Sequence, residues 1–168
     1  MTPTKIDLLL NCKWIIPIVP ENQTLTDCAI AIDNGKIIGL LPQAEAARKF
    51  SAGKVQDLDH HIVMPGLVNS HGHAAMSLLR GYADDLALRA WLENHIWPAE
   101  AKFLSEEFVQ DGTRLSIAEM IRSGTTCFAD MYFFDEAIAT EVRNSGVRSQ
   151  ISFTVLDFPT PYGKNADD

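Results

Sequence analysis

The sequence predicts an α/β fold in which a small antiparallel β unit precedes parallel strands joined by helices. Two observations lead to this prediction. Before residue 60 the apolar segments are short, rich in Ile, Leu and Val, and separated by turn-forming residues, as in antiparallel strands. After residue 60, strand-like apolar segments alternate with helical ones, and consecutive strands with helical crossovers pair in parallel.

The N-terminal β unit is expected to contain three strands and one short helix, in this order: residues 6–19, 28–32, 36–41 and 43–50. Asn34 and Gly35 separate the second and third strands, and both residues tolerate the positive φ of a tight hairpin turn. So small a unit cannot bury a stable core by itself. We therefore expect it to pack against another part of the protein.

The α/β part is expected to run strand, two helices, strand, helix and strand, in this order: residues 62–73, 86–96, 105–123, 125–131, 135–144 and 147–158. Ser105 and the two glutamates after it favour a helix start, because the helix dipole stabilises acidic side chains there. Gly124 and Gly146 are expected to end helices. Three parallel strands with two crossovers do not close a barrel.

Composition and charge exclude several kinds of partner. The 14 basic and 22 acidic residues give a net charge of −8, whereas binding to nucleic acid needs clustered Lys and Arg. The apolar stretches are shorter than the ~20 residues of a membrane span, and the N-terminus lacks signal-peptide features. Cys12, Cys28 and Cys127 suit neither a disulfide framework nor a CxxC zinc site, which favours reduced thiols in a cytoplasmic protein.

His71 and His73 are the candidate metal ligands, at the C-terminal end of the expected strand 62–73. In a strand, residues i and i+2 point to the same side, so both imidazoles would face one divalent ion. Zinc binds imidazole nitrogen at about 2.0–2.1 Å. Taken alone, the spacing is a weak indication of a metal site, because it also fits two partly exposed histidines at the end of a strand.

Residues 64–73 resemble the first barrel strand of the amidohydrolase superfamily, where Pro-Gly-Leu, an apolar residue and Asn or Asp precede His-x-His. Three further segments resemble the subgroup that deaminates 5-methylthioadenosine and S-adenosylhomocysteine: residues 79–86, 91–92 and 97–100. The resemblance implies an incomplete (β/α)8 TIM barrel, of which residues 62–168 supply the first three strands. It also implies that residues 1–61 are the N-terminal part of a small β-sandwich domain.

The same resemblance implies metal-dependent hydrolytic deamination of an adenosine-type nucleoside. His71 and His73 would bind one divalent metal, zinc in the first place, with iron or manganese as alternatives. Glu100 would accept hydrogen bonds from the ribose hydroxyls, as a carboxylate can from a vicinal diol. Read from its own sequence context, Glu100 also fits a solvated acid at a helix start after Pro98.

In the resembling family the other metal ligands and the acid/base glutamate lie on later strands, so no catalytic residue is expected on this chain. The chain would then be inactive alone and need the rest of the barrel, in cis or in trans, with a homo-oligomer as one arrangement. Guanine deaminases and triazine chlorohydrolases are the alternative activities. A non-catalytic fragment or binding module with an incidental His-x-His pair is the alternative of a different class.

Several side chains near these segments have two interpretations each. Asp130 fits either support of the metal site or helix capping and packing. Asp84 and Asp85 fit either a helix cap or a substrate loop, and Arg80 either pairs with Asp84 or holds a loop. Two tryptophans fit either the core or a pocket wall: Trp91 and Trp97. Three histidines are expected to be structural or surface residues: His60, His61 and His95.

Overall fold

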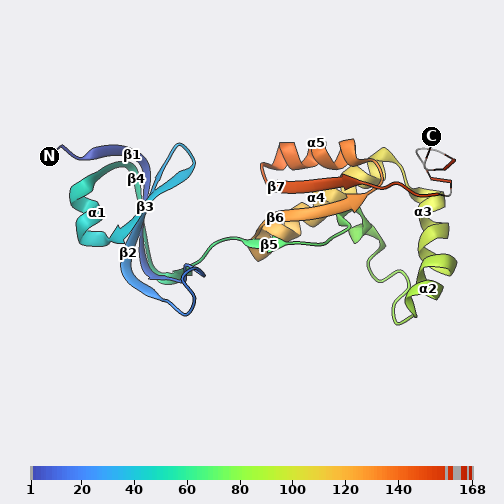
Figure 1. Cartoon of the computed structure of the whole chain (residues 1–168), viewed down its shortest axis with the longest axis horizontal. Coiled ribbons are helices and arrows are strands. Elements are labelled where there is room, and N and C mark those ends of the chain that lie inside the picture. The colour runs from blue at the N-terminus through green and yellow to red at the C-terminus, as the bar shows by residue number, and fades with distance from the viewer. Residues whose placement is uncertain (1, 158, 161–163, 166, 168) are drawn as a thin grey trace. The chain divides into compact units, whose positions relative to one another are not determined.

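The computed structural model describes residues 2–157, 159–160, 164–165 and 167, and divides the chain into two compact units (Figure 1). The first unit spans Met1–Pro65 and the second spans Gly66–Asp168. Within the described residues, no helix combines the length and apolar character that crossing a membrane requires.

The first unit is a four-stranded sheet with one short helix, α1 (Gln43–Lys49). Its strands are β1 (Thr4–Ile15), β2 (Leu25–Asp33), β3 (Lys36–Pro42) and β4 (Phe50–Val63), in the order β3-β2-β1-β4. The expected hairpin is confirmed, because β2 and β3 pair antiparallel and Asp33 faces Lys36 across the turn. The purely antiparallel expectation is wrong, because β4 pairs with β1 in parallel.

Most of strand β4 is absent from the sequence-based prediction, which places only its last residues, 62–63, in a strand. His60 and His61 lie inside β4 rather than before a strand. Most of its side chains are exposed, and it occupies one edge of the sheet. An edge strand can be held by backbone pairing without burying an apolar face, so its sequence shows no alternation of apolar and polar residues. The 14-residue strand is therefore polar enough to resemble a loop.

The core of this unit lies around β1, β2, α1 and the first residue of β4, where six buried apolar residues form one cluster: Ile6, Leu9, Ala29, Ala31, Ala46 and Phe50. Five large apolar side chains of β3 and β4 remain exposed: Ile37, Ile38, Leu40, Val55 and Ile62. Burial of apolar area is the main favourable contribution to folding. A unit that leaves this much apolar surface in solvent is consistent with the expectation that it packs against further protein.

We expect Gly35→Ala to destabilise the first unit by about 1 kcal/mol, because Ala is disfavoured at a left-handed φ. Gly35 has φ 71° and no atom within 4 Å of an added Cβ, so the cost would be conformational. Urea unfolding followed by circular dichroism measures it. Gly53→Ala is the matched control, because its Cβ would make only an ordinary 3.4 Å contact with the Asp7 carbonyl. Equal losses in both variants would contradict the prediction.

The second unit contains a three-stranded sheet of β5 (Leu67–Asn69), β6 (Thr125–Tyr132) and β7 (Arg148–Phe153), in the order β5-β6-β7. Both pairings are parallel, which confirms the prediction of parallel strands with helical crossovers. The two crossover helices α4 (Glu106–Ser123) and α5 (Asp135–Ser145) pack beside the sheet and against each other (Figure 1). Gly124 and Gly146 end these helices in the left-handed conformation, as predicted.

The outer strands of this sheet are shorter than predicted. Strand β5 ends at Asn69, so the expected strand 62–73 is divided between the end of β4, a linker and three residues of β5. Strand β7 ends at Phe153 rather than at residue 158, and residue 158 itself lies outside the described residues.

The expected helix 86–96 is one part of a longer irregular helix. It begins as α2 (Leu88–Trp91), passes through a π turn η2 (Leu92–Ile96) and continues as α3 (Trp97–Phe103). Trp97 donates its backbone N–H to Leu92, five residues earlier, directly before Pro98. Proline has no N–H for the regular i→i−4 bond, which favours a local departure from α-helical geometry at this point.

The 3₁₀ helix η1 (Ala74–Leu79) follows β5 and packs directly on α4. The two helices approach closely at Gly112 of α4, because a Cβ there would lie 2.3 Å from the Ala75 carbonyl oxygen. Ser77 Oγ also donates to the Gly112 carbonyl oxygen across 2.8 Å. These contacts fix the segment that begins immediately after His73.

Candidate metal and ligand site

His71 and His73 lie in the loop after β5, not in a strand as expected, and their rings nevertheless meet. The ring centroids are 5.1 Å apart and the ring planes are inclined by 80°. Asn69 shapes the turn that brings them together, because its Oδ1 accepts the backbone N–H of His71 at 3.3 Å. The expectation that strand geometry points both imidazoles to one side is therefore wrong. The two rings do lie together, through the geometry of the loop.

His73 is oriented by the neighbouring strand, because its Nδ1 lies 2.7 Å from the carbonyl oxygen of Met131 in β6. A carbonyl oxygen only accepts, so Nδ1 carries the hydrogen and donates. The lone pair is then on Nε2, which is the arrangement that metal-binding histidines usually have. Nε2 of His73 is thus available to bind a metal ion.

Asp130 is buried directly beside this pair, with 3% of its surface exposed. Both of its carboxylate oxygens lie 3.2 Å from the backbone nitrogen of Ala74, at the start of η1. Burial raises the pKa of Asp130. The hydrogen bonds from the backbone of Ala74 and Met131 oppose this rise, as does the nearby His73. Asp130 therefore holds the start of η1, the segment next to His73, which is compatible with both expected roles.

Glu100, in the first turn of α3, accepts a hydrogen bond from the Tyr132 hydroxyl at the end of β6, with 2.5 Å between Oη and Oε1. Burial raises the pKa of Glu100, while the Tyr132 hydrogen bond and the proximity of His73 lower it. Burial and the carboxylates of Glu100 and Asp130 raise the pKa of Tyr132 far above its usual value. Tyr132 is therefore a neutral donor and Glu100 its acceptor.

Tyr132 was not predicted as a site residue, although one signal for it is present in the sequence. Alternate residues of β6 are buried on one face, namely Phe128, Asp130 and Tyr132. Residues i and i+2 of a strand share a face, so Tyr132 follows Asp130 toward the same side. Its ring lies 6.4 Å from the His73 ring, which joins the histidine pair to Glu100.

A pocket of about 430 Å³ opens beside Glu100. Its described lining is mainly apolar, and Glu100 is the one charged side chain among these described residues: Trp97, Glu100, Ala101, Leu104, Phe133, Leu156, Pro159 and Thr160. Small-molecule sites commonly combine apolar walls with a few placed polar groups. This pocket therefore suits a mostly apolar molecule that presents a hydrogen-bond donor to the carboxylate.

Whether the described residues fit a zinc ion depends on the number of ligands. No group of three or more His, Cys, Asp or Glu residues is placed to hold a metal within the described part of the chain. A catalytic zinc site uses about three protein ligands and a water molecule. The two facing imidazoles fit as two of these ligands, and the set needs at least one more from elsewhere.

The remaining candidates have other roles in the structure. Arg80 forms a two-pronged ion pair with Glu119 of α4, at 2.9 and 2.6 Å, instead of pairing with Asp84. Asp84 and Asp85 do not cap the next helix, because Ala87 is its N-cap residue and no side chain bonds there. Trp91 is half-buried, and Trp97 lines the pocket. The rings of His95 and Tyr82 meet edge-on, with their centroids 6.4 Å apart.

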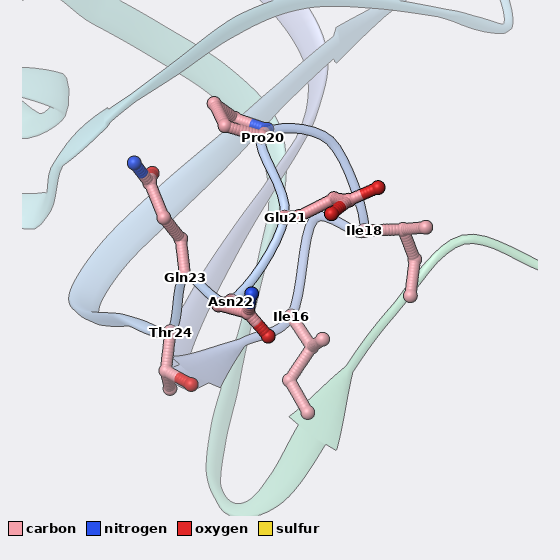
Figure 2. A pocket seen from close by; sticks show the side chains of 7 residues that line it. All are labelled: Ile16, Ile18, Pro20, Glu21, Asn22, Gln23 and Thr24. Atoms are coloured by element: carbon pink, nitrogen blue, oxygen red, sulfur yellow. The ribbon is translucent and has the colours of Figure 1, made fainter.

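A second pocket, of about 450 Å³, lies in the first unit within the loop between β1 and β2. Figure 2 shows its seven lining side chains, which all come from this one loop: Ile16, Ile18, Pro20, Glu21, Asn22, Gln23 and Thr24. None of these seven is a His or Cys, and Glu21 is the single acid among them. The lining thus has no set of metal ligands and no nucleophile with an adjacent base.

Comparison with known proteins agrees with the geometry of the second unit. The sequence model of the amidohydrolase family matches residues 62–168. Proteins named 5-methylthioadenosine/S-adenosylhomocysteine deaminase from Teredinibacter turnerae and Saccharophagus degradans are 47% and 48% identical over 98% of this chain and 37% of their own length. The chain thus spans little more than a third of these relatives.

A solved structure shows the same fold with metal. The zinc-bound crystal structure of an adenosine deaminase from Xanthomonas campestris matches 99% of this chain and 38% of its own, with TM-score 0.95 and 43% identity. The likeness therefore extends over the sequence of both units. Since the family model covers most of the sequence, this chain belongs to the amidohydrolase family.

Proposed function

We propose that this chain supplies the first part of a zinc-dependent enzyme that hydrolytically deaminates an adenosine-type nucleoside, 5-methylthioadenosine or S-adenosylhomocysteine. The observation that carries the proposal is the joined set of His71, His73, Tyr132 and Glu100, with a pocket beside it. The names of the 47% and 48% identical relatives support the reaction and its substrates.

His71 and His73 would hold the metal ion, with His73 fixed by Met131 and its Nε2 directed to the metal. The Xanthomonas structure supports zinc, with iron and manganese as alternatives for an imidazole site. A bound zinc ion lowers the pKa of water to about 7 and so supplies a nucleophile at neutral pH. Asp130 would keep the His73 loop in place through its bonds to Ala74.

The residues that move protons in this reaction are not assigned to this chain, and a complete barrel would provide them together with the missing metal ligands. We propose that residues 1–61 belong to a small β-sandwich domain and residues 62–168 to the barrel, completed in cis or in trans or within a homo-oligomer. The free Cys12, Cys28 and Cys127 support a reducing compartment such as the cytoplasm.

Glu100 would bind the ribose, and we expect Glu100→Gln in the complete gene product to raise KM for a ribonucleoside roughly tenfold. In this variant the ribose hydroxyl would donate to a neutral amide oxygen instead of a charged carboxylate. The weaker hydrogen bond lowers the affinity by roughly tenfold. Steady-state kinetics at neutral pH measures the effect. The control is Glu119→Gln, which alters an exposed ion pair of α4 outside the pocket. An unchanged KM in Glu100→Gln would remove Glu100 from the sugar site.

The decisive experiment is to assay the complete gene product, loaded with zinc, on four substrates: 5-methylthioadenosine, S-adenosylhomocysteine, guanine and a chlorotriazine. We expect ammonia release from the two adenosine derivatives. Turnover of guanine or the chlorotriazine alone would keep the superfamily and overturn the substrate. The 168-residue chain assayed alone should show no turnover, and deamination by it that disappears in His71→Ala would contradict its incompleteness.

A further inference from the structure

Tyr132 is a buried phenol whose position is fixed by the core of the second unit. Only 5% of its surface is exposed, and it belongs to a buried cluster with Val109 and Ile138. Its ring also meets Phe133 at 5.6 Å with an interplanar angle of 61°. The hydroxyl is therefore held in one place, and in that place it donates to Glu100.

Glu100 has no comparable support of its own. It lies on α3, a helix of 7 residues, and its side chain is only half-buried. Oε1 accepts the Tyr132 hydrogen bond, whereas Oε2 accepts none from the described residues, and Glu100 lines the pocket. One carboxylate oxygen is thus anchored, and the other is left for a ligand.

Two consecutive residues at the end of β6 connect the two halves of the site. The Met131 carbonyl oxygen accepts from His73, and the Tyr132 hydroxyl donates to Glu100. Successive residues of a strand are held at a fixed separation by the backbone. The separation between the histidine pair and the Glu100 carboxylate is therefore set by a single strand end.

We propose that Tyr132 is a positioning residue, which holds Glu100 at a fixed distance from the histidine pair so that Oε2 meets a ribose hydroxyl of the ligand. This inference rests on the proposed function, in which the base reacts beside the histidines. A nucleoside has a nearly fixed span between its base and its sugar hydroxyls. A carboxylate pre-placed at that span binds the sugar without first losing side-chain freedom.

The test is Tyr132→Phe in the complete gene product, with equilibrium binding of a purine ribonucleoside and of its 2′,3′-dideoxy analogue. Phe keeps the ring and the packing and removes only the hydrogen bond. We expect Kd for the ribonucleoside to rise roughly tenfold and Kd for the dideoxy analogue to stay unchanged. KM for the ribonucleoside should rise in step, with kcat altered less than about twofold, as for loss of uniform binding.

The comparison of two sugars separates positioning from a structural role. Equal weakening toward both ligands, or none toward either, would overturn the inference, and so would a wild-type protein that does not distinguish them. Tyr82→Phe is the matched control, because Tyr82 is 54% exposed and contacts His95, so its ligand binding should be unchanged.

Failure of the proposed function would look different. A wild-type protein that distinguishes the sugars, loses the distinction in Tyr132→Phe and releases no ammonia would support the positioning role and refute the deaminase. A protein that binds neither nucleoside would overturn both. The pairing has its own readout, because the ¹³Cζ resonance of Tyr132 should shift in Glu100→Gln. An unchanged resonance there would overturn the inference irrespective of activity.

Discussion

Replacing His73 by Ala in the complete gene product should weaken zinc binding by roughly 100-fold or more, because loss of a residue behind a ligand already costs about 10–100-fold. This variant removes the imidazole, and with it the hydrogen bond from Nδ1 to the Met131 carbonyl oxygen that orients the ring. Zinc content after dialysis and competition with a chelator measure the loss. In the proposed reaction the metal would supply the nucleophile, so deamination should fall with the zinc content.

His61→Ala is the matched control for this variant. His61 is exposed in β4 of the first unit, and its removal should leave zinc content unchanged. Circular dichroism should show both variants folded, because His73 lies in a loop and its ring is only partly buried. Equal zinc loss in both variants, or full zinc retention in His73→Ala, would contradict the assignment of His73 as a ligand.

Gly112→Ala should destabilise the second unit by roughly 1–3 kcal/mol, the usual cost of overpacking a well-packed interior. Helix propensity alone predicts the opposite sign, because Ala is favoured over Gly within a helix by about 1 kcal/mol. Steric contact outweighs propensity here, because the new Cβ would lie 2.3 Å from the Ala75 carbonyl oxygen and 2.8 Å from its Cα. Both are backbone atoms, so no side-chain rotation can relieve the contact.

Urea unfolding of the complete gene product measures this change, and Ala118→Gly in the same helix measures the propensity contribution at an exposed position. We expect both variants to be destabilised, although they change the helix propensity in opposite directions. We also expect Gly112→Ala to lose zinc, because displacement of η1 moves the residue that follows His73. A stabilised Gly112→Ala protein would show that η1 can shift at little cost.

The elements whose ends carry local signals could be predicted from the sequence. Helix α4 begins after Ser105, whose Oγ accepts the Phe108 backbone N–H at 3.1 Å, and ends at Gly124 with φ 88°. Strand β6 and helix α5 follow from apolar content and from the glycine after the helix. Strand β4 could not be predicted, because pairing with β1 holds a polar segment whose partner is distant in the sequence.

The candidate site was predicted only in part for the same physical reason. The His-x-His motif identified His71 and His73, but they meet through a loop turn at Asn69 and not through strand geometry. The bond between Tyr132 and Glu100 joins residues 32 positions apart, on a strand and a helix. No local pattern encodes such a pair, because it depends on how the helix packs against the strand end.

The π turn at Leu92–Ile96 sets the angular phase of the helix that carries Glu100. A π turn holds one residue more than an α-helical turn, and each residue advances an α-helix by about 100°. Deleting one residue from this turn would therefore rotate α3 by about that angle and direct Glu100 away from Tyr132. The number of residues between Trp91 and Glu100 is therefore expected to matter more for the direction of Glu100 than the identity of most residues between them.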